Sequence, residues 1–172
     1  FAKEYEAVNR KLSAFAKFDE LTGLYNRRMF NIAMEEALKN RRDSTQLALL
    51  DMDNFKKVND QYGHYAGDKV LKELSSLLQK NFNVDKHIVS RWGGDEFAII
   101  YYGEKNELMQ KLDKIKKVFS LYVSSYDETT GISTSIVSFG DYDEVSQIVM
   151  AADHQLYMEK RKRHSKHSDA KS

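Results

Sequence analysis

The chain has 172 residues, of which 41% are hydrophobic and 31% charged, which is the balance of an ordinary globular domain. It has no cysteine, which excludes disulfides and thiolate metal sites, and it has no apolar run near the roughly 20 residues that a membrane-spanning helix needs. The net charge of +1 combines a basic segment, residues 160–172, with a mildly acidic remainder. We therefore expect no nucleic-acid partner and no membrane contact by this fragment. The lack of cysteine fits a cytoplasmic protein, or the cytoplasmic domain of a membrane-bound sensor.

Apolar periodicity divides the chain into alternating helices and strands. Helices are expected at residues 1–17, 27–41, 68–82, 104–121 and 143–160, and strands at 46–52, 87–92, 96–102 and 132–139. Only Gly93, Gly94 and Asp95 separate the second and third strands, which predicts a hairpin. Strands interleaved with helices around one sheet predict a layered α/β or α+β domain.

The two ends of the chain differ from this main domain. Residues 1–17 carry a lone apolar stripe, so we expect a linker helix that packs against an upstream helix or against a partner's copy of itself. The basic residues 164–172 lack apolar periodicity, and we expect them to form a disordered tail. The main domain is therefore expected to span residues 18–163.

Carboxylates gather at the mouths of two predicted strands. Asp51 and Asp53 end the run LALLDMD, and Asp95 and Glu96 follow the glycines of RWGGDEF. If these strands are neighbours, their carboxylates repel one another unless a cation lies between them. Oxygen ligands without a nearby His or Cys select Mg²⁺ or Mn²⁺, and such an ion is usually completed by the phosphates of a nucleotide. The alternative is a hairpin turn that is acidic for ordinary reasons.

Other residues near these carboxylates suit the same chemistry. A Gly-Gly turn at Gly93 and Gly94 exposes backbone N–H groups and lets a phosphate or ribose approach closely. Lys56 follows the first acidic pair and can meet phosphate charge. We expect Asp53 to face the opposite side from Asp51, as a supporting or capping residue.

The segment GGDEF at 93–97 resembles the signature of the GGDEF family, the diguanylate cyclases. Three further stretches are similar to motifs of that family in the same order: DELTGLYNRR (19–28), DMDNFKKVNDQYGHYAGDKVL (51–71) and ADHQLYMEK (152–160). The resemblance implies a palm-like α+β fold whose central, mostly antiparallel five-stranded sheet is flanked by helices. It also implies the condensation of two GTP into cyclic di-GMP and two pyrophosphates at a homodimer interface, with Mg²⁺ or Mn²⁺ as cofactor and an upstream sensor domain as partner.

The resemblance implies a role for each matching residue. The metal ligands would be Asp51, the backbone carbonyl of Met52, Asp95 and Glu96. Asp95 would also accept the proton of the attacking 3′-hydroxyl, and Lys56 would stabilise phosphate charge. The remaining substrate contacts would come from Phe55, Asn59, Asp68, Gly93, Gly94 and Lys160. Among these, Asn59 and Asp68 resemble the pair that reads guanine, although both also suit helix caps.

Three departures from the family pattern limit what the resemblance implies. Val84 and His87 stand where the family's inhibitory motif has arginine and aspartate, so we predict no product inhibition at that site. Val137 replaces a usual glycine, and RKRH (161–164) replaces a usual Gly-Arg-Asn. These changes leave open a second function, a catalytically silent GTP-binding regulatory module. A third hypothesis, that the chain serves mainly as a dimerisation segment, rests on helix 1–17 alone.

Overall fold

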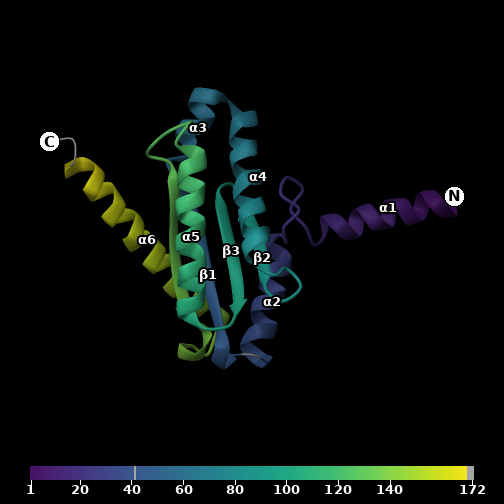
Figure 1. Cartoon of the computed structure of the whole chain (residues 1–172). Helices are drawn as coiled ribbons and strands as arrows, with labels where there is room; N and C mark the ends of the chain where they lie inside the picture. The colour runs from purple at the N-terminus through teal and green to yellow at the C-terminus, as the bar shows by residue number, and fades with distance from the viewer. Residues whose placement is uncertain (41, 170–172) are drawn as a thin grey trace.

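The structure, a computed structural model, describes residues 1–40 and 42–169. Within these ranges the chain forms one antiparallel sheet of four strands in the order β2–β3–β1–β4 (Figure 1). The strands are β1 (Thr45–Asp53), β2 (Ile88–Gly93), β3 (Glu96–Tyr102) and β4 (Gly131–Ser138). The α-helices are α1 (Ala2–Phe15), α2 (Arg27–Asn40), α3 (Phe55–Tyr62), α4 (His64–Asn81), α5 (Lys105–Val123) and α6 (Val145–Asp169). The expected α+β class, an antiparallel sheet flanked by helices, is confirmed.

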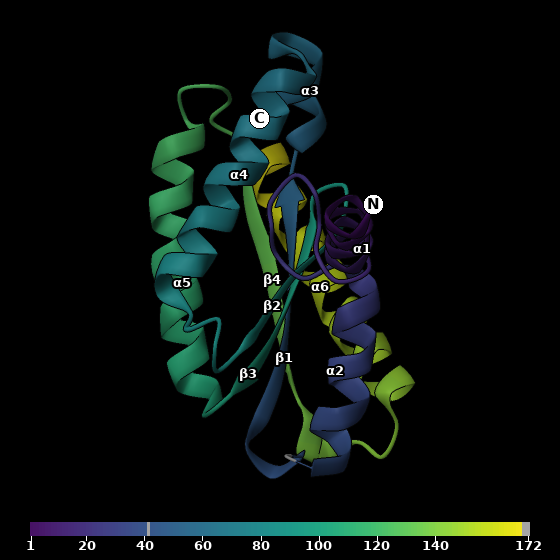
Figure 2. The ribbon, with the colours of Figure 1, turned by 90° about the vertical axis from the view of Figure 1, so that its right-hand side faces the viewer.

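Helices cover both faces of the sheet, which explains why the central strand β1 reads as a continuous apolar run. Figure 2 shows α4 and α5 on one side of the sheet and α2 and α6 on the other. Successive side chains of a strand point to opposite faces. Ala48 and Leu50 therefore join the core beneath α4 and α5, whereas Leu47 and Leu49 join the core beneath α2 and α6. Packing on both faces holds the end of β1, and hence Asp51, in a fixed position.

The resemblance implied five strands, and the described residues form four. At the β2 edge, Tyr25 makes only an isolated bridge, in which its N–H donates to the Val89 carbonyl at 3.2 Å and its carbonyl accepts from the Arg91 N–H at 3.0 Å. At the other edge, β4 pairs with β1 alone. The chain after Lys160 has no glycine to end the helix, so it continues as α6 instead of returning to the sheet as a strand.

Two helices are longer than expected. α4 begins at His64, four residues before the predicted start, because Gly63 adopts a φ of 86° and turns the chain sharply between α3 and α4. α6 continues to Asp169, so residues 164–169 are helical where we expected a disordered tail. Residues 170–172 of that tail, and residue 41 of the second predicted helix, lie outside the described residues.

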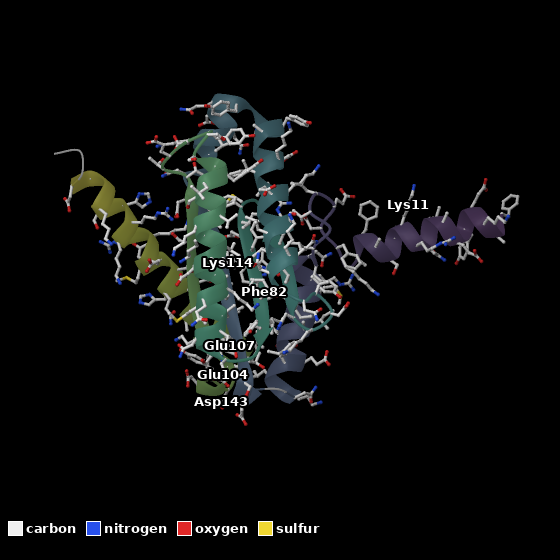
Figure 3. The ribbon with its side chains drawn as sticks, viewed as in Figure 1. Lys11, Phe82, Glu104, Glu107, Lys114 and Asp143 are labelled. Carbon is white, nitrogen blue, oxygen red and sulfur yellow. The ribbon has the colours of Figure 1, made fainter. Side chains whose placement is uncertain are left out.

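The predicted N-terminal helix is present as α1, and it extends away from the rest of the domain (Figure 1). Figure 3 shows Lys11 on this projecting helix. The apolar stripe of α1 is exposed along its whole length, and its members are Phe1, Tyr5, Val8, Leu12 and Phe15. In the described ranges, no helix is both long and apolar enough to cross a bilayer.

Candidate active site

The glycine hairpin between β2 and β3 brings Asp95 against the end of β1. Gly93 and Gly94 have φ angles of 136° and 53°, in the left-handed region that favours glycine. The backbone carbonyl of Asp95 accepts a hydrogen bond from the Met52 N–H at 3.3 Å. The two acidic positions that the sequence predicted at neighbouring strand ends, Asp51 and Asp95, therefore meet at one edge of the sheet.

Burial and the neighbouring carboxyl of Asp51 disfavour ionisation of the Asp95 carboxyl. Burial, followed by repulsion from Asp51, raises the pKa of Asp95 from its usual 3.8 to about 6, against the opposing influence of Lys160. A hydrogen bond with the Asp51 carboxyl acts in the same direction as the repulsion. Either a proton on Asp95 or a nearby cation reduces the repulsion between the two carboxyls, so this edge of the sheet favours the binding of positive charge.

Helix α6 supplies one cation to this edge. The Lys160 ammonium lies 2.9 Å from the Asp51 carboxylate and 3.8 Å from the Asp53 carboxylate. It also donates to the Met52 carbonyl at 3.4 Å. Asp51 and the Met52 carbonyl were both predicted as metal ligands, so the side chain predicted to bind phosphate lies against two of the expected ligand oxygens.

These oxygen atoms fit a magnesium or manganese ion that is held in part by its substrate. Among the described residues, no three carboxylate or imidazole side chains gather closely enough to hold a metal ion by themselves. Glu96 pairs with Asp51 across the β1–β3 ladder, but its side chain is exposed. Asp51, Asp95 and the Met52 carbonyl form an all-oxygen set. Mg²⁺ commonly takes one or two carboxylates and completes its shell with phosphate oxygens and water.

The packing of α3 against α4 brings Asn59 against Gly67, the residue directly before Asp68. Asn59 lies inside α3 and Asp68 lies in the second turn of α4, whereas the residues that precede the two helices are Asn54 and Gly63. Helix capping, the alternative for both residues, is therefore excluded. The Asn59 amide oxygen lies so close to Gly67 that a Cβ atom there would collide with it. Because Gly67 has no side chain, α3 and α4 can pack closely with the Asn59 side chain between them.

The first turn of α3 begins two residues after β1 ends, and it can serve phosphate oxygens. Phe55 is the first residue of α3, and the side chain of Asn54 before it makes no capping hydrogen bond. The first N–H groups of a helix have no intrahelical acceptor and attract anions. Lys56 is exposed in the same turn, and it forms no ion pair within the described part of the chain.

The sequence interpretation missed an ionic cluster that fixes the hairpin. The Arg91 guanidinium donates to the Gly94 carbonyl at 2.8 and 3.0 Å, and it lies 3.0 Å from the Asp19 carboxylate. Asp19 also accepts hydrogen bonds from the N–H and hydroxyl of Thr22 at 2.9 and 2.7 Å. The available signal was an arginine two residues before a Gly-Gly turn. The conformation of the hairpin therefore depends on residues directly after α1.

The prediction that Asp53 faces away from Asp51 is wrong. Residues two apart on a strand share a face, and Lys160 accordingly contacts both carboxylates. Asp53 is buried, accepts hydrogen bonds from the Ser133 hydroxyl at 2.8 and 2.9 Å, and pairs with Arg163 of α6. Asp53 thus anchors α6, and with it Lys160, to the end of β1.

The residues that depart from the family pattern are accommodated in different ways. His87 is buried, its Nδ1 accepts a hydrogen bond from the Tyr102 N–H at 3.1 Å, and its ring stacks on Tyr101 with centroids 4.4 Å apart. Val84 is exposed. Val137 is buried in the core beneath α2 and α6. The absence of product inhibition stays a prediction, which this burial of His87 supports.

Comparison with known proteins agrees with this geometry. A family model described as the diguanylate cyclase GGDEF domain matches residues 16–166. The diguanylate cyclase DgcS of Shewanella oneidensis is 31% identical over 154 residues, which cover 88% of this chain and 52% of DgcS. The probable diguanylate cyclase DgcI of Escherichia coli is 36% identical over 149 residues, which cover 87% of this chain and 32% of DgcI. The chain therefore spans about half or less of the length of these relatives.

Solved structures show the same fold. The coiled coil and GGDEF domain of DgcB from Caulobacter crescentus, in complex with c-di-GMP, matches with a TM-score of 0.78 and 25% identity, covering 93% of this chain and 88% of that one. The diguanylate cyclase SiaD of Pseudomonas aeruginosa, in complex with its activator SiaC, matches with a TM-score of 0.74 and 29% identity, covering 94% of this chain and 64% of that one. With the family match, the antiparallel sheet and the glycine hairpin in agreement, the chain belongs to the GGDEF family of diguanylate cyclases.

Proposed function

We propose that this domain is an active diguanylate cyclase, which condenses two GTP into cyclic di-GMP and releases two pyrophosphates. The observation that carries the proposal is the convergence of Asp51, Asp95 and Lys160 beside the Met52 carbonyl at the glycine hairpin. Relatives named as diguanylate cyclases support it. The alternative of an ordinary acidic turn does not account for the lysine that α6 brings to the same oxygens.

Each residue at the hairpin has a chemical task in this reaction. A bound Mg²⁺ or Mn²⁺ ion would neutralise phosphate charge and stabilise the attacking 3′-oxygen, and Asp51, Asp95 and the Met52 carbonyl would hold it, with Glu96 at the rim. A carboxylate oxygen of Asp95 accepts the proton of the 3′-hydroxyl. A metal ion bound beside Asp95 would lower the pKa of its carboxyl again, so stabilisation of the 3′-oxygen by the metal would contribute more than the strength of this base. Lys56 and the N–H groups at the start of α3 meet the triphosphate.

The preference for GTP over ATP would come from Asn59 and Asp68. A carboxylate can accept hydrogen bonds from N1–H and the exocyclic amine of guanine, while an amide serves O6 or N3. Adenine lacks this pair of donors, so it would leave Asp68 without partners at a cost of about 1–3 kcal/mol. The close approach of Asn59 to Gly67 supports this assignment, since it places the amide against the residue directly before Asp68.

The proposed reaction needs two copies of the domain. The described residues form one glycine hairpin with one such carboxylate pair, whereas the product joins two nucleotides. The apolar stripe of α1 is exposed, and a second copy of the same helix would bury it. We therefore propose a homodimer in the cytoplasm whose pairing through α1 is set by an upstream sensor domain.

One observation favours a second candidate, a regulatory module that binds GTP without turning it over. Lys160 already neutralises Asp51, which the reaction would need as a metal ligand. If Lys160 kept this ion pair in the presence of GTP, the metal would be excluded and no chemistry would follow. Release of pyrophosphate distinguishes the two candidates, because only the cyclase turns GTP over.

The deciding experiment measures pyrophosphate release from GTP and Mg²⁺ over a range of protein concentrations. We expect release to rise faster than linearly with protein, to vanish in Asp95→Ala and to persist in Asp85→Ala, which removes an exposed carboxylate elsewhere. GTP binding without release, in the free chain and in a chain dimerised through a fused coiled coil, would overturn the cyclase proposal and favour the silent module.

A further inference from the structure

A groove of about 430 Å³ lies between α5 and α6, beside the edge strand β4. Its floor is formed by Thr134, Ser135 and Ile136 of β4. Its two walls come from α5 and α6, and their principal members are Lys105, Met109, Lys116, His154, Met158 and Lys162. The volume falls within the range of about 300–1,000 Å³ that is usual for ligand sites. None of these residues belongs to the candidate active site.

The floor of this groove carries unused hydrogen-bonding groups. Among the strands of the described residues, β4 pairs only with β1. The N–H and C=O groups of alternate β4 residues point away from β1, and they have no strand partner within the described residues. Near the start of β4 the Ile132 carbonyl accepts a hydrogen bond from Arg163, but no comparable contact covers residues 134–136. The Ser135 hydroxyl is buried and has no hydrogen-bond partner in the described chain. Buried polar groups normally have partners, so this floor calls for a ligand that brings its own donors and acceptors.

The dimensions of the groove suit an extended peptide. Lys105 and Lys116 are eleven residues apart on α5, which corresponds to about 16 Å along the helix axis. An extended strand covers that length with about five residues. Such a strand would turn alternate side chains toward α5 and α6, where Met109 and Met158 offer adaptable apolar contacts.

The charged side chains that line the groove indicate which kind of peptide it would bind. Lys105, Lys116 and Lys162 line the groove, against two carboxylates, Asp113 and Glu159. None of these five side chains forms an ion pair within the described residues. We propose that the groove binds an extended, acidic peptide segment of a partner protein, which adds to the sheet as a fifth strand beside β4. Main-chain hydrogen bonds to β4 would provide affinity and the three lysines would select acidic side chains. This proposal does not depend on nucleotide chemistry.

The test is a selection from a displayed library of random heptapeptides with the whole 172-residue chain as bait. We expect the recovered peptides to be rich in Asp, Glu and β-branched residues and poor in proline. By fluorescence anisotropy they should bind at least about tenfold more weakly to the double variant Lys116→Glu, Lys162→Glu. The matched control is Lys117→Glu, Lys166→Glu, which makes the same charge change on the same two helices outside the groove and should bind like the wild type. Far-UV circular dichroism establishes that both variants are folded.

Backbone methylation separates strand addition from other modes of binding. N-methylation of alternate peptide residues should abolish binding, whereas methylation of the intervening residues should be tolerated, because only every second N–H of an added strand faces β4. Failure to recover any such peptide would overturn the proposal. It would also be overturned if the peptides bound both double variants equally, or if methylation at all positions had the same effect.

Discussion

Replacing Asp95 with asparagine should stabilise the metal-free domain at neutral pH. Burial and the charge of Asp51 raise the pKa of Asp95 from 3.8 to about 6 in the folded protein. Well below pH 3.8 the carboxyl is protonated in both the folded and the unfolded chain, so it carries no penalty. As the pH rises through the interval from 3.8 to about 6, the unfolded chain releases its proton first, and the folded state therefore loses stability.

The magnitude follows from the size of this change. A rise of the pKa from 3.8 to about 6 corresponds to about 3 kcal/mol if it acts in full. Because Asp95 is only partly buried, solvent screening reduces the expected penalty to about 1–2 kcal/mol. Asparagine has nearly the same shape and cannot ionise, so Asp95→Asn should be more stable than the wild type by this amount above pH 6, and the difference should disappear well below pH 3.8.

Urea unfolding in the presence of EDTA, at intervals between about pH 3 and pH 8, measures this difference. The two stability curves should diverge between pH 4 and pH 6 and run parallel above that interval. Millimolar Mg²⁺ at pH 7 should stabilise the wild type more than the variant, since only the wild type keeps both carboxylates. Parallel curves over the whole range would refute the reasoning that burial and Asp51 act against ionised Asp95.

Three further predictions concern other parts of the site. Gly67→Ala should displace the Asn59 amide and raise KM for GTP by about tenfold, while the helix propensity gained by alanine, about 1 kcal/mol, offsets part of the packing cost. Steady-state kinetics of Gly67→Ala and Asn59→Ala, alone and combined, measure this effect. Fully additive changes in KM would contradict the inference that both substitutions act through the Asn59 amide. Arg163→Met should lower the free energy of unfolding by about 2–4 kcal/mol, because it removes the ion-pair partner of the buried Asp53 carboxylate. Arg161→Met, at an exposed position, should leave that free energy almost unchanged, and urea or thermal unfolding measures both. His87, at the position of the inhibitory motif's aspartate, is buried, so added cyclic di-GMP should leave the initial rate of pyrophosphate release unchanged. Inhibition by cyclic di-GMP bound near His87 would contradict this prediction.

Sequence patterns sufficed where one physical requirement dominated. The run LALLDMD predicts a strand that is buried on both faces and ends in carboxylates, and β1 is that strand. Asn26 is a residue type that favours helix N-termini; it directly precedes α2, and its side chain accepts a hydrogen bond from the Met29 N–H at 3.0 Å. In these cases local preference and tertiary packing agree, so a short stretch of sequence carries the information.

The patterns failed where a distant partner decides the outcome. The stretch RKRH has no apolar periodicity, yet it continues α6, since Arg163 reaches Asp53 across more than a hundred residues of chain. α4 starts at His64, four residues before the predicted start; Gly67 is a poor helix former in isolation, and its packing against Asn59 is visible only in three dimensions. The contact of Arg91 with Asp19 spans 72 residues and likewise has no local signature.

That contact also determines how motion at the N-terminus reaches the hairpin. Only residues 16–18 separate the end of α1 from Asp19, and a single guanidinium joins Asp19 to the Gly94 carbonyl. A helix of 14 residues is a lever about 21 Å long. Asp19 and Arg91 therefore give motion of α1 a direct side-chain route to the turn that holds Asp95, alongside the hydrogen bonds that tie the Phe15 and Lys17 carbonyls to Asn26 at the start of α2.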